Sequence, residues 1–172
     1  MTTDRPAGGQ ERADLLETLA THRRFLRYTV RDLTDDQARE RTTTSALCLG
    51  GLIKHVTRME QNWAGFIVRG PEGLSSGTDG LAAHMASFCM EEDETLAGLL
   101  ERYEDVARRT DDLVASLPSL DVSQPLPPAP WFEPGARFSA RRAMLHIIAE
   151  TAQHAGHADI IRESLDGAKT MG

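Results

Sequence analysis

The sequence predicts an all-α protein, more specifically a four-helix bundle. Four long stretches repeat apolar residues every three or four positions, which is the spacing of one face of a helix. Capping residues or proline-rich segments separate these stretches, and no segment alternates apolar and polar residues as a half-buried strand does. There is also no internal repeat. Helices with one apolar face bury that face against one another, and four of them do so in a bundle.

Length and composition limit the domain organisation, the partners and the location that we expect for this protein. With 172 residues, we expect a flexible N-terminus over residues 1–9, one helical domain over 10–165 and a polar tail over 166–172. The net charge of −7 predicts no nucleic-acid partner, because phosphates require clustered Lys and Arg. No apolar run reaches the roughly 20 residues of a membrane span and no signal peptide is present, so we expect no membrane association and a cytoplasmic location. Two cysteines predict no disulfide framework.

The first helix is expected over residues 10–32, where Leu15, Leu19, Leu26 and Val30 form an apolar stripe. Arginines, including Arg23, are expected on the opposite, solvent-facing side. His22 lies near the edge of the stripe and is expected to be a core or rim residue. Downstream, residues 34–37 have the form of a capping box and predict one short helical turn.

The second helix is expected over residues 46–68, with Ser45 as its N-cap. His55 shares a broad face with large apolar residues and should therefore point inward; these residues are Leu52, Val56, Met59, Trp63 and Phe66. A polar, glycine-rich connection follows over residues 70–80. His84 lies in a stretch that the pattern does not assign.

The third and fourth helices are expected over residues 90–117 and 138–164, the latter capped by Ser139. Acidic residues precede and open the third helix, where they would form a solvated face that complements its macrodipole. Between the two helices, residues 118–137 carry six prolines together with Trp131 and Phe132. This connection is expected either to act as a lid or pocket wall or simply to plug the core.

The last helix also concentrates residues that bind metals. His146, Glu150, His154 and His157 fall within roughly 80° of one helical face. The apolar residues around them predict a largely buried helix: Leu145, Ile148, Ala149, Ala152 and Ile160. Buried imidazoles and carboxylates are costly unless paired, and Glu and His four apart can reach one divalent cation. The same spacing is common by chance, so an ordinary polar stripe is the alternative. His55 is the candidate for a third ligand.

Two segments resemble the motifs of a known family. GGLIKH, which ends at His55, and the VTRME that follows resemble the second-helix motif of the DinB/YfiT-like superfamily of bacterial metalloenzymes. ETAQHAGHADIIRE, which begins at Glu150, resembles its fourth-helix motif. The resemblance covers nearly the whole chain. It implies a four-helix bundle with up-down-down-up order that is often dimeric, for which Trp63 and Phe66 are interface candidates unless they pack in the core.

The resemblance also implies a ligand set. Family members hold a divalent metal, zinc or nickel, through one residue of the second helix and two of the fourth. The matching positions here are His55, Glu150 and His154, and the glutamate resembles the mycothiol-dependent maleylpyruvate isomerase branch and actinobacterial DinB-like proteins. His157 and His146 are then expected beside the ligands, with a role in catalysis.

The expected function is thiol S-transfer at the metal, with a low-molecular-weight thiol such as mycothiol and a small-molecule substrate. Three protein ligands leave an open coordination position for a thiolate, and a neutral His146 or His157 would accept the thiol proton. Two alternatives remain open. The same site would support metal-dependent hydrolysis with an activated water, or the protein would be a non-catalytic, stress-associated metal-binding protein.

Overall fold

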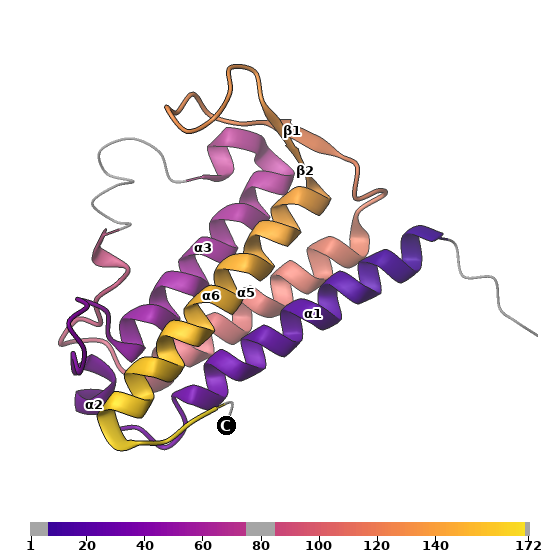
Figure 1. Cartoon of the computed structure of the whole chain (residues 1–172). Coiled ribbons are helices and arrows are strands. Elements are labelled where there is room, and N and C mark those ends of the chain that lie inside the picture. Colours follow the sequence, from indigo (N-terminus) through magenta and orange to yellow (C-terminus); the bar gives the residue numbers. More distant parts are fainter. Residues whose placement is uncertain (1–6, 75–84, 171–172) are drawn as a thin grey trace, which may run out of the picture.

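The computed structural model describes residues 7–74 and 85–170, and within them the long elements are helices (Figure 1). The helices are α1 (Ala7–Thr29), the short α2 (Asp35–Arg39), α3 (Leu49–Arg69), the 3-10 helix η1 (Gly70–Gly73), α5 (Leu96–Ser116) and α6 (Ala140–Asp166). The all-α prediction is confirmed. Most of the predicted glycine-rich connection, His84 and the first six residues lie outside the described residues.

In the described part of the chain, the four long helices pack side by side (Figure 1). α6 contacts both α1 and α3, and α5 contacts α3 and, more weakly, α1. α3 and α5 run in the same direction, while α1 and α6 run in the opposite one. Their apolar faces meet in a core that includes Leu19, Leu26, Leu52, Phe66, Tyr103 and Ile147. None of the described helices is long and apolar enough to cross a membrane.

A buried ion pair links three of these helices, and it corrects the prediction for Arg23. The side chain of Arg23, on α1, is buried, and its guanidinium donates to both carboxylate oxygens of Glu60 on α3, at 2.5 and 3.1 Å. It also donates to Asp111 on α5, at 2.9 Å. Burial alone would lower the pKa of Arg23, but the two carboxylates raise it above its ordinary value. The arginine therefore stays charged inside the protein.

The start of α3 differs from the prediction. Ser45 does not cap the helix; its hydroxyl accepts a hydrogen bond from the Leu47 amide in the preceding turn. Cys48 is the N-cap, and its Sγ accepts from the amide of Gly51 at 3.4 Å. At Gly51 the backbone lies so close to the Phe88 carbonyl that a Cβ would overlap it, and at Gly50 a Cβ would overlap Met90. The segment before α5 therefore packs directly on the first turn of α3.

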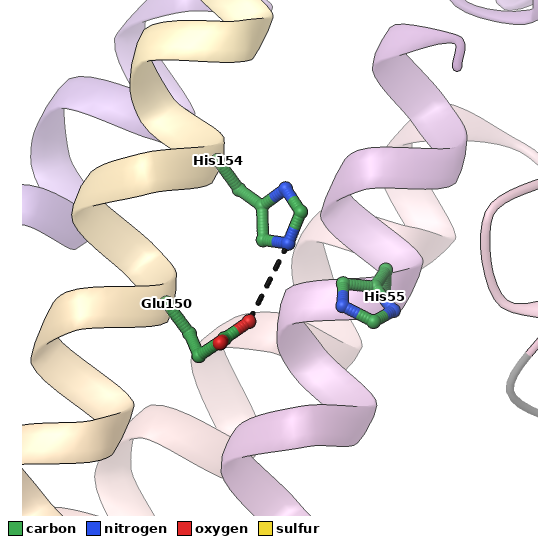
Figure 2. Close-up of side chains that lie close together, drawn as sticks. All are labelled: His55, Glu150 and His154. Carbon is green, nitrogen blue, oxygen red and sulfur yellow. Dashed lines mark ion pairs between the residues drawn. The ribbon is translucent and has the colours of Figure 1, made fainter. Parts of the chain in front are cut away.

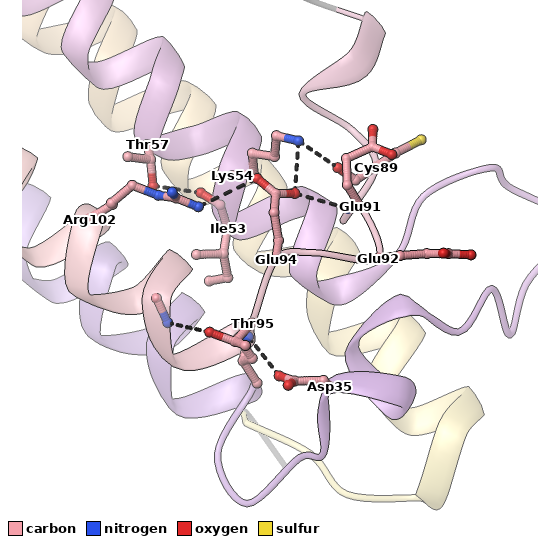
Figure 3. A network of polar contacts seen from close by, with 12 residues as sticks. Asp35, Ile53, Lys54, Thr57, Cys89, Glu91, Glu92, Glu94, Thr95 and Arg102 are labelled. Carbon is pink, nitrogen blue, oxygen red and sulfur yellow. Dashed lines mark hydrogen bonds and ion pairs between the residues drawn. The ribbon is translucent and has the colours of Figure 1, made fainter.

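The predictions for the third helix were partly wrong. α5 begins at Leu96, with Thr95 as its N-cap, and its first turn holds no acidic residue. The carboxylate of Asp35 accepts from the Leu96 amide at 2.7 Å, which fixes this start. Glu94 is also not part of a solvated face. Its side chain is largely buried and forms ion pairs with Lys54 and Arg102 (Figure 3).

The proline-rich connection contains two short strands that the sequence analysis did not anticipate. β1 (Ser123–Pro125) and β2 (Arg137–Ser139) pair antiparallel at the end of the helices. Trp131 is 76% exposed, so it does not plug the core. Phe138 instead stacks on Trp63 of α3 with 5.7 Å between ring centroids. The aromatic residue next to α6, rather than the loop tip, therefore contacts the helices.

Two local predictions hold. The Thr34 hydroxyl accepts from the Gln37 amide and the Gln37 side chain accepts from the Thr34 amide, so the capping box at α2 is confirmed. Ser139 caps α6 by accepting from the Arg142 amide at 3.1 Å. The expected burial of α6 is wrong on one side, because Leu145 and Ile160 are 44% and 63% exposed.

Candidate metal centre

His55 on α3 meets Glu150 and His154 on α6 in the space between the two helices (Figure 2). One potential ligand atom from each residue lies within 4.8 Å of the other two. Glu150 Oε2 is 3.6 Å from His154 Nε2, and the two imidazole ring centroids are 4.8 Å apart. The structure thus brings together the three residues that the sequence singled out as ligands.

Helical geometry explains this convergence. Glu150 and His154 are four residues apart and therefore lie one above the other on the face of α6 that packs against α3. His55 lies on the facing side of α3 with 4% of its surface exposed, and His154 has 8% exposed. Glu150 is half-buried. Imidazole nitrogens and a carboxylate oxygen are common ligands of divalent cations, and a cation among these three groups would offset part of the cost of burying them.

The imidazoles of His55 and His154 each contact a neighbouring side chain through Nδ1. Nδ1 of His55 is 3.0 Å from the hydroxyl of Ser87, and the ring of Phe88 stacks on the same imidazole at 3.9 Å. Nδ1 of His154 is 3.4 Å from Nδ1 of His157. In His154 the other ring nitrogen, Nε2, faces Oε2 of Glu150 at 3.6 Å. Histidines that bind metals are commonly oriented by a hydrogen bond on the second ring nitrogen.

Sequence reasoning missed Ser87 and Phe88. They lie in the segment before α5 where no periodic pattern exists, and they reach His55 only because this segment packs on the glycines that begin α3. A serine and a phenylalanine carry no metal signal of their own. Only the tertiary contact identifies them.

Electrostatics at the site favours the anionic form of Glu150 and the neutral form of His146. The hydrogen bond with His154 holds the pKa of Glu150 below its ordinary value, against the effect of burial, and the nearby histidines lower it further. His146 lies one turn earlier, half-buried against the ring of Trp63 at 4.5 Å. Burial lowers the pKa of His146, although the Glu150 charge opposes this. His146 is thus an imidazole that stays neutral, able to accept a proton.

The donor set suits a divalent transition metal. Two imidazole nitrogens and one carboxylate oxygen are ligands of zinc and of nickel. Ligand atoms about 2.0–2.2 Å from one ion are at most about 4.4 Å apart. The three ligand atoms here all lie within 4.8 Å of one another, so small side-chain rotations would close the group around an ion.

Comparisons with known proteins bear on the fold and the family of this chain. The family model described as mycothiol-S-transferase matches residues 14–167. A search of curated proteins finds no significant match. Among solved structures, the crystal structure of a conserved protein from Enterococcus faecalis is similar with a TM-score of 0.57 and 14% identity, over 90% of this chain and 96% of that one. At this identity the match shows a shared fold alone. The family match confirms the resemblance seen in the sequence: the chain belongs to the mycothiol-S-transferase family, in the mycothiol-related branch of the DinB/YfiT-like superfamily.

Proposed function

We propose that the protein is a metal-dependent S-transferase that uses a low-molecular-weight thiol, such as mycothiol, and a small electrophilic substrate. The observation that carries the proposal is the convergence of His55, Glu150 and His154 in a chain of the mycothiol-S-transferase family. A zinc or nickel ion bound there would have an open position, and would stabilise a thiolate at neutral pH.

The surrounding side chains have defined roles in this proposal. The neutral imidazole of His146 accepts the thiol proton, since its lowered pKa keeps it unprotonated before the reaction. His157 contacts His154 and holds that ring in place; it is the second candidate for proton acceptor. The thiol sulfur then forms a bond to the electrophilic carbon of the substrate. The displaced group leaves with the electron pair of its broken bond.

Two further proposals concern architecture and location. α3 and α5 run opposite to α1 and α6, which supports an up-down-down-up bundle. The contacts among these four helices support a single domain over residues 10–165. Cys48 and Cys89 are both free thiols. Free cysteines are typical of a reducing compartment, which supports the cytoplasm as the place of action.

The function is tested by metal analysis combined with a thiol-conjugation assay. We expect purified protein to hold about one zinc or nickel ion per chain and to conjugate mycothiol to an electrophile such as a bimane. Removal of the metal with a chelator should stop conjugation, and added metal should restore it. Conjugation that survives complete metal removal would contradict the proposal. Turnover without any thiol would indicate a hydrolase instead, and bound metal without turnover a binding protein.

We also propose a homodimer, now through a different surface from the one predicted. Phe66 is fully buried and Trp63 packs against Phe138, so the expected interface candidates serve the core. The exposed apolar side chains on α6, Leu145 and Ile160, offer a face instead. Light scattering at micromolar concentration should show a dimer, and Ile160→Glu should make it monomeric. Val68→Glu alters an exposed apolar residue on α3 and should leave the dimer intact. A monomeric wild-type protein would contradict this prediction.

A further inference from the structure

A pocket lies between α3, α5 and the segment that precedes α5, whereas the candidate metal centre lies between α3 and α6. Its volume is about 200 Å³. Its lining includes three cationic side chains, a single carboxylate and one leucine: Lys54, Arg58, Arg102, Glu94 and Leu99. The family match and the proposed S-transfer assign nothing to this pocket.

The charges in the pocket do not balance. Glu94 accepts a hydrogen bond from Lys54 at 2.9 Å and lies 3.4 Å from Arg102 (Figure 3). Among the residues that the structure describes, no carboxylate pairs with Arg58. One carboxylate thus faces three cations, in a protein whose formal net charge is −7. A local excess of positive charge in an acidic protein indicates a site for an anion.

The donors, the apolar wall and the volume of the pocket limit the class of anion that it can bind. A guanidinium offers two parallel N–H donors that match a carboxylate, and the bidentate pair is stronger than a single hydrogen bond. Leu99 is buried and gives the pocket an apolar wall, which suits a ligand with a hydrocarbon part. The volume is below the roughly 300–1,000 Å³ of sites for drug-sized molecules. A short organic acid fits all three features.

We propose that this pocket binds the carboxylate of a short organic acid through Arg58, with Lys54 adding positive charge. The site lies next to the metal centre without being part of it. Ser87 belongs to both, because its side chain lines the pocket while its hydroxyl bonds to Nδ1 of His55 at 3.0 Å. An acid bound in the pocket therefore lies beside the residue that orients His55.

The test uses ¹⁹F NMR of 4-fluorobenzoate with metal-free protein, so that the probe cannot bind to a metal ion. We expect saturable line broadening, and Arg58→Gln should weaken the affinity at least about tenfold, the loss expected for a charge-assisted pair. Arg69→Gln is the matched control, because Arg69 is an exposed arginine on the same helix that does not line the pocket. Its affinity should equal that of the wild type. Circular dichroism verifies that both variants are folded.

Competition experiments distinguish a carboxylate ligand from a phosphate ligand. Unlabelled benzoate should displace the probe, whereas inorganic phosphate at the same concentration should displace little. The proposal is overturned if wild-type protein shows no saturable broadening, if Arg58→Gln binds as well as Arg69→Gln, or if phosphate competes as well as benzoate. The assay contains neither thiol nor electrophile, so failure of the S-transferase proposal would leave its outcome unaffected. A second readout is the ¹⁵N chemical shift of the His55 ring, which should move on binding.

Discussion

Replacing His154 with alanine is expected to abolish tight metal binding. The change removes one of the three side chains that converge between α3 and α6 and also the partner that lowers the pKa of Glu150. Loss of a residue that merely orients a ligand costs roughly 10- to 100-fold in metal affinity or activity. Loss of a ligand should cost more than that. Competition with a chelator of known affinity, followed by elemental analysis, measures the change.

Two matched histidine variants make this result specific. His22→Ala alters a half-buried histidine on α1 that contacts Phe25 and lies outside the centre, so metal affinity should stay unchanged. His157→Ala removes the ring beside His154 and should reduce activity more than metal affinity. A His154→Ala protein that still carries stoichiometric metal would refute the assigned ligand set.

Replacing Arg23 with methionine should cause a large loss of stability. The variant leaves Glu60 fully buried with no cation beside it. Removing one partner of a buried pair typically lowers the free energy of unfolding by about 3–5 kcal/mol. Arg24→Met, at an exposed position next to it, should have little effect. Urea unfolding measures both, and equal stability of the two variants would contradict the prediction.

The pH dependence of this loss has a definite sign. Burial raises the pKa of Glu60, and without Arg23 the main opposition to this rise is gone and the hydrogen bond with Thr110 is left to lower the pKa. A group with a raised folded-state pKa stabilises the fold at low pH and loses this contribution as the pH rises through that pKa. The deficit of Arg23→Met should therefore shrink on acidification. A double variant, Arg23→Met with Glu60→Leu, should recover most of the stability, because no unpaired charge remains buried.

The sequence predicted what depends on local chemistry. Apolar spacing located the long helices, and side-chain oxygens at Thr34 and Ser139 marked helix starts that the structure confirms. The spacing within α6 likewise placed Glu150 and His154 on one face. These features follow from rules that act within about one helical turn, so they can be found in a single chain.

What the sequence did not predict depends on contacts between distant segments. Arg23 was expected in solvent because arginine usually is, and only Glu60, 37 positions later, explains its burial. Glu94 looked like part of an acidic, solvated run until Lys54 and Arg102 were found beside it. Cys48 replaced Ser45 as a cap because α3 begins where Gly50 and Gly51 meet the segment before α5.

The two glycines that begin α3 limit how the centre could be redesigned. They allow the chain around Phe88 and Met90 to lie against the helix backbone, and this same chain supports His55 with Ser87 and Phe88. Alanine at position 51 would displace the Phe88 carbonyl. Ser87 and Phe88, which support His55 one helical turn after Gly51, would move with it. An engineered library that aims at new metal specificity should therefore vary residues 86–90 and keep both glycines. Substitution of these glycines, which lie outside the candidate ligand set, would disturb the support of His55 and so the geometry of that set.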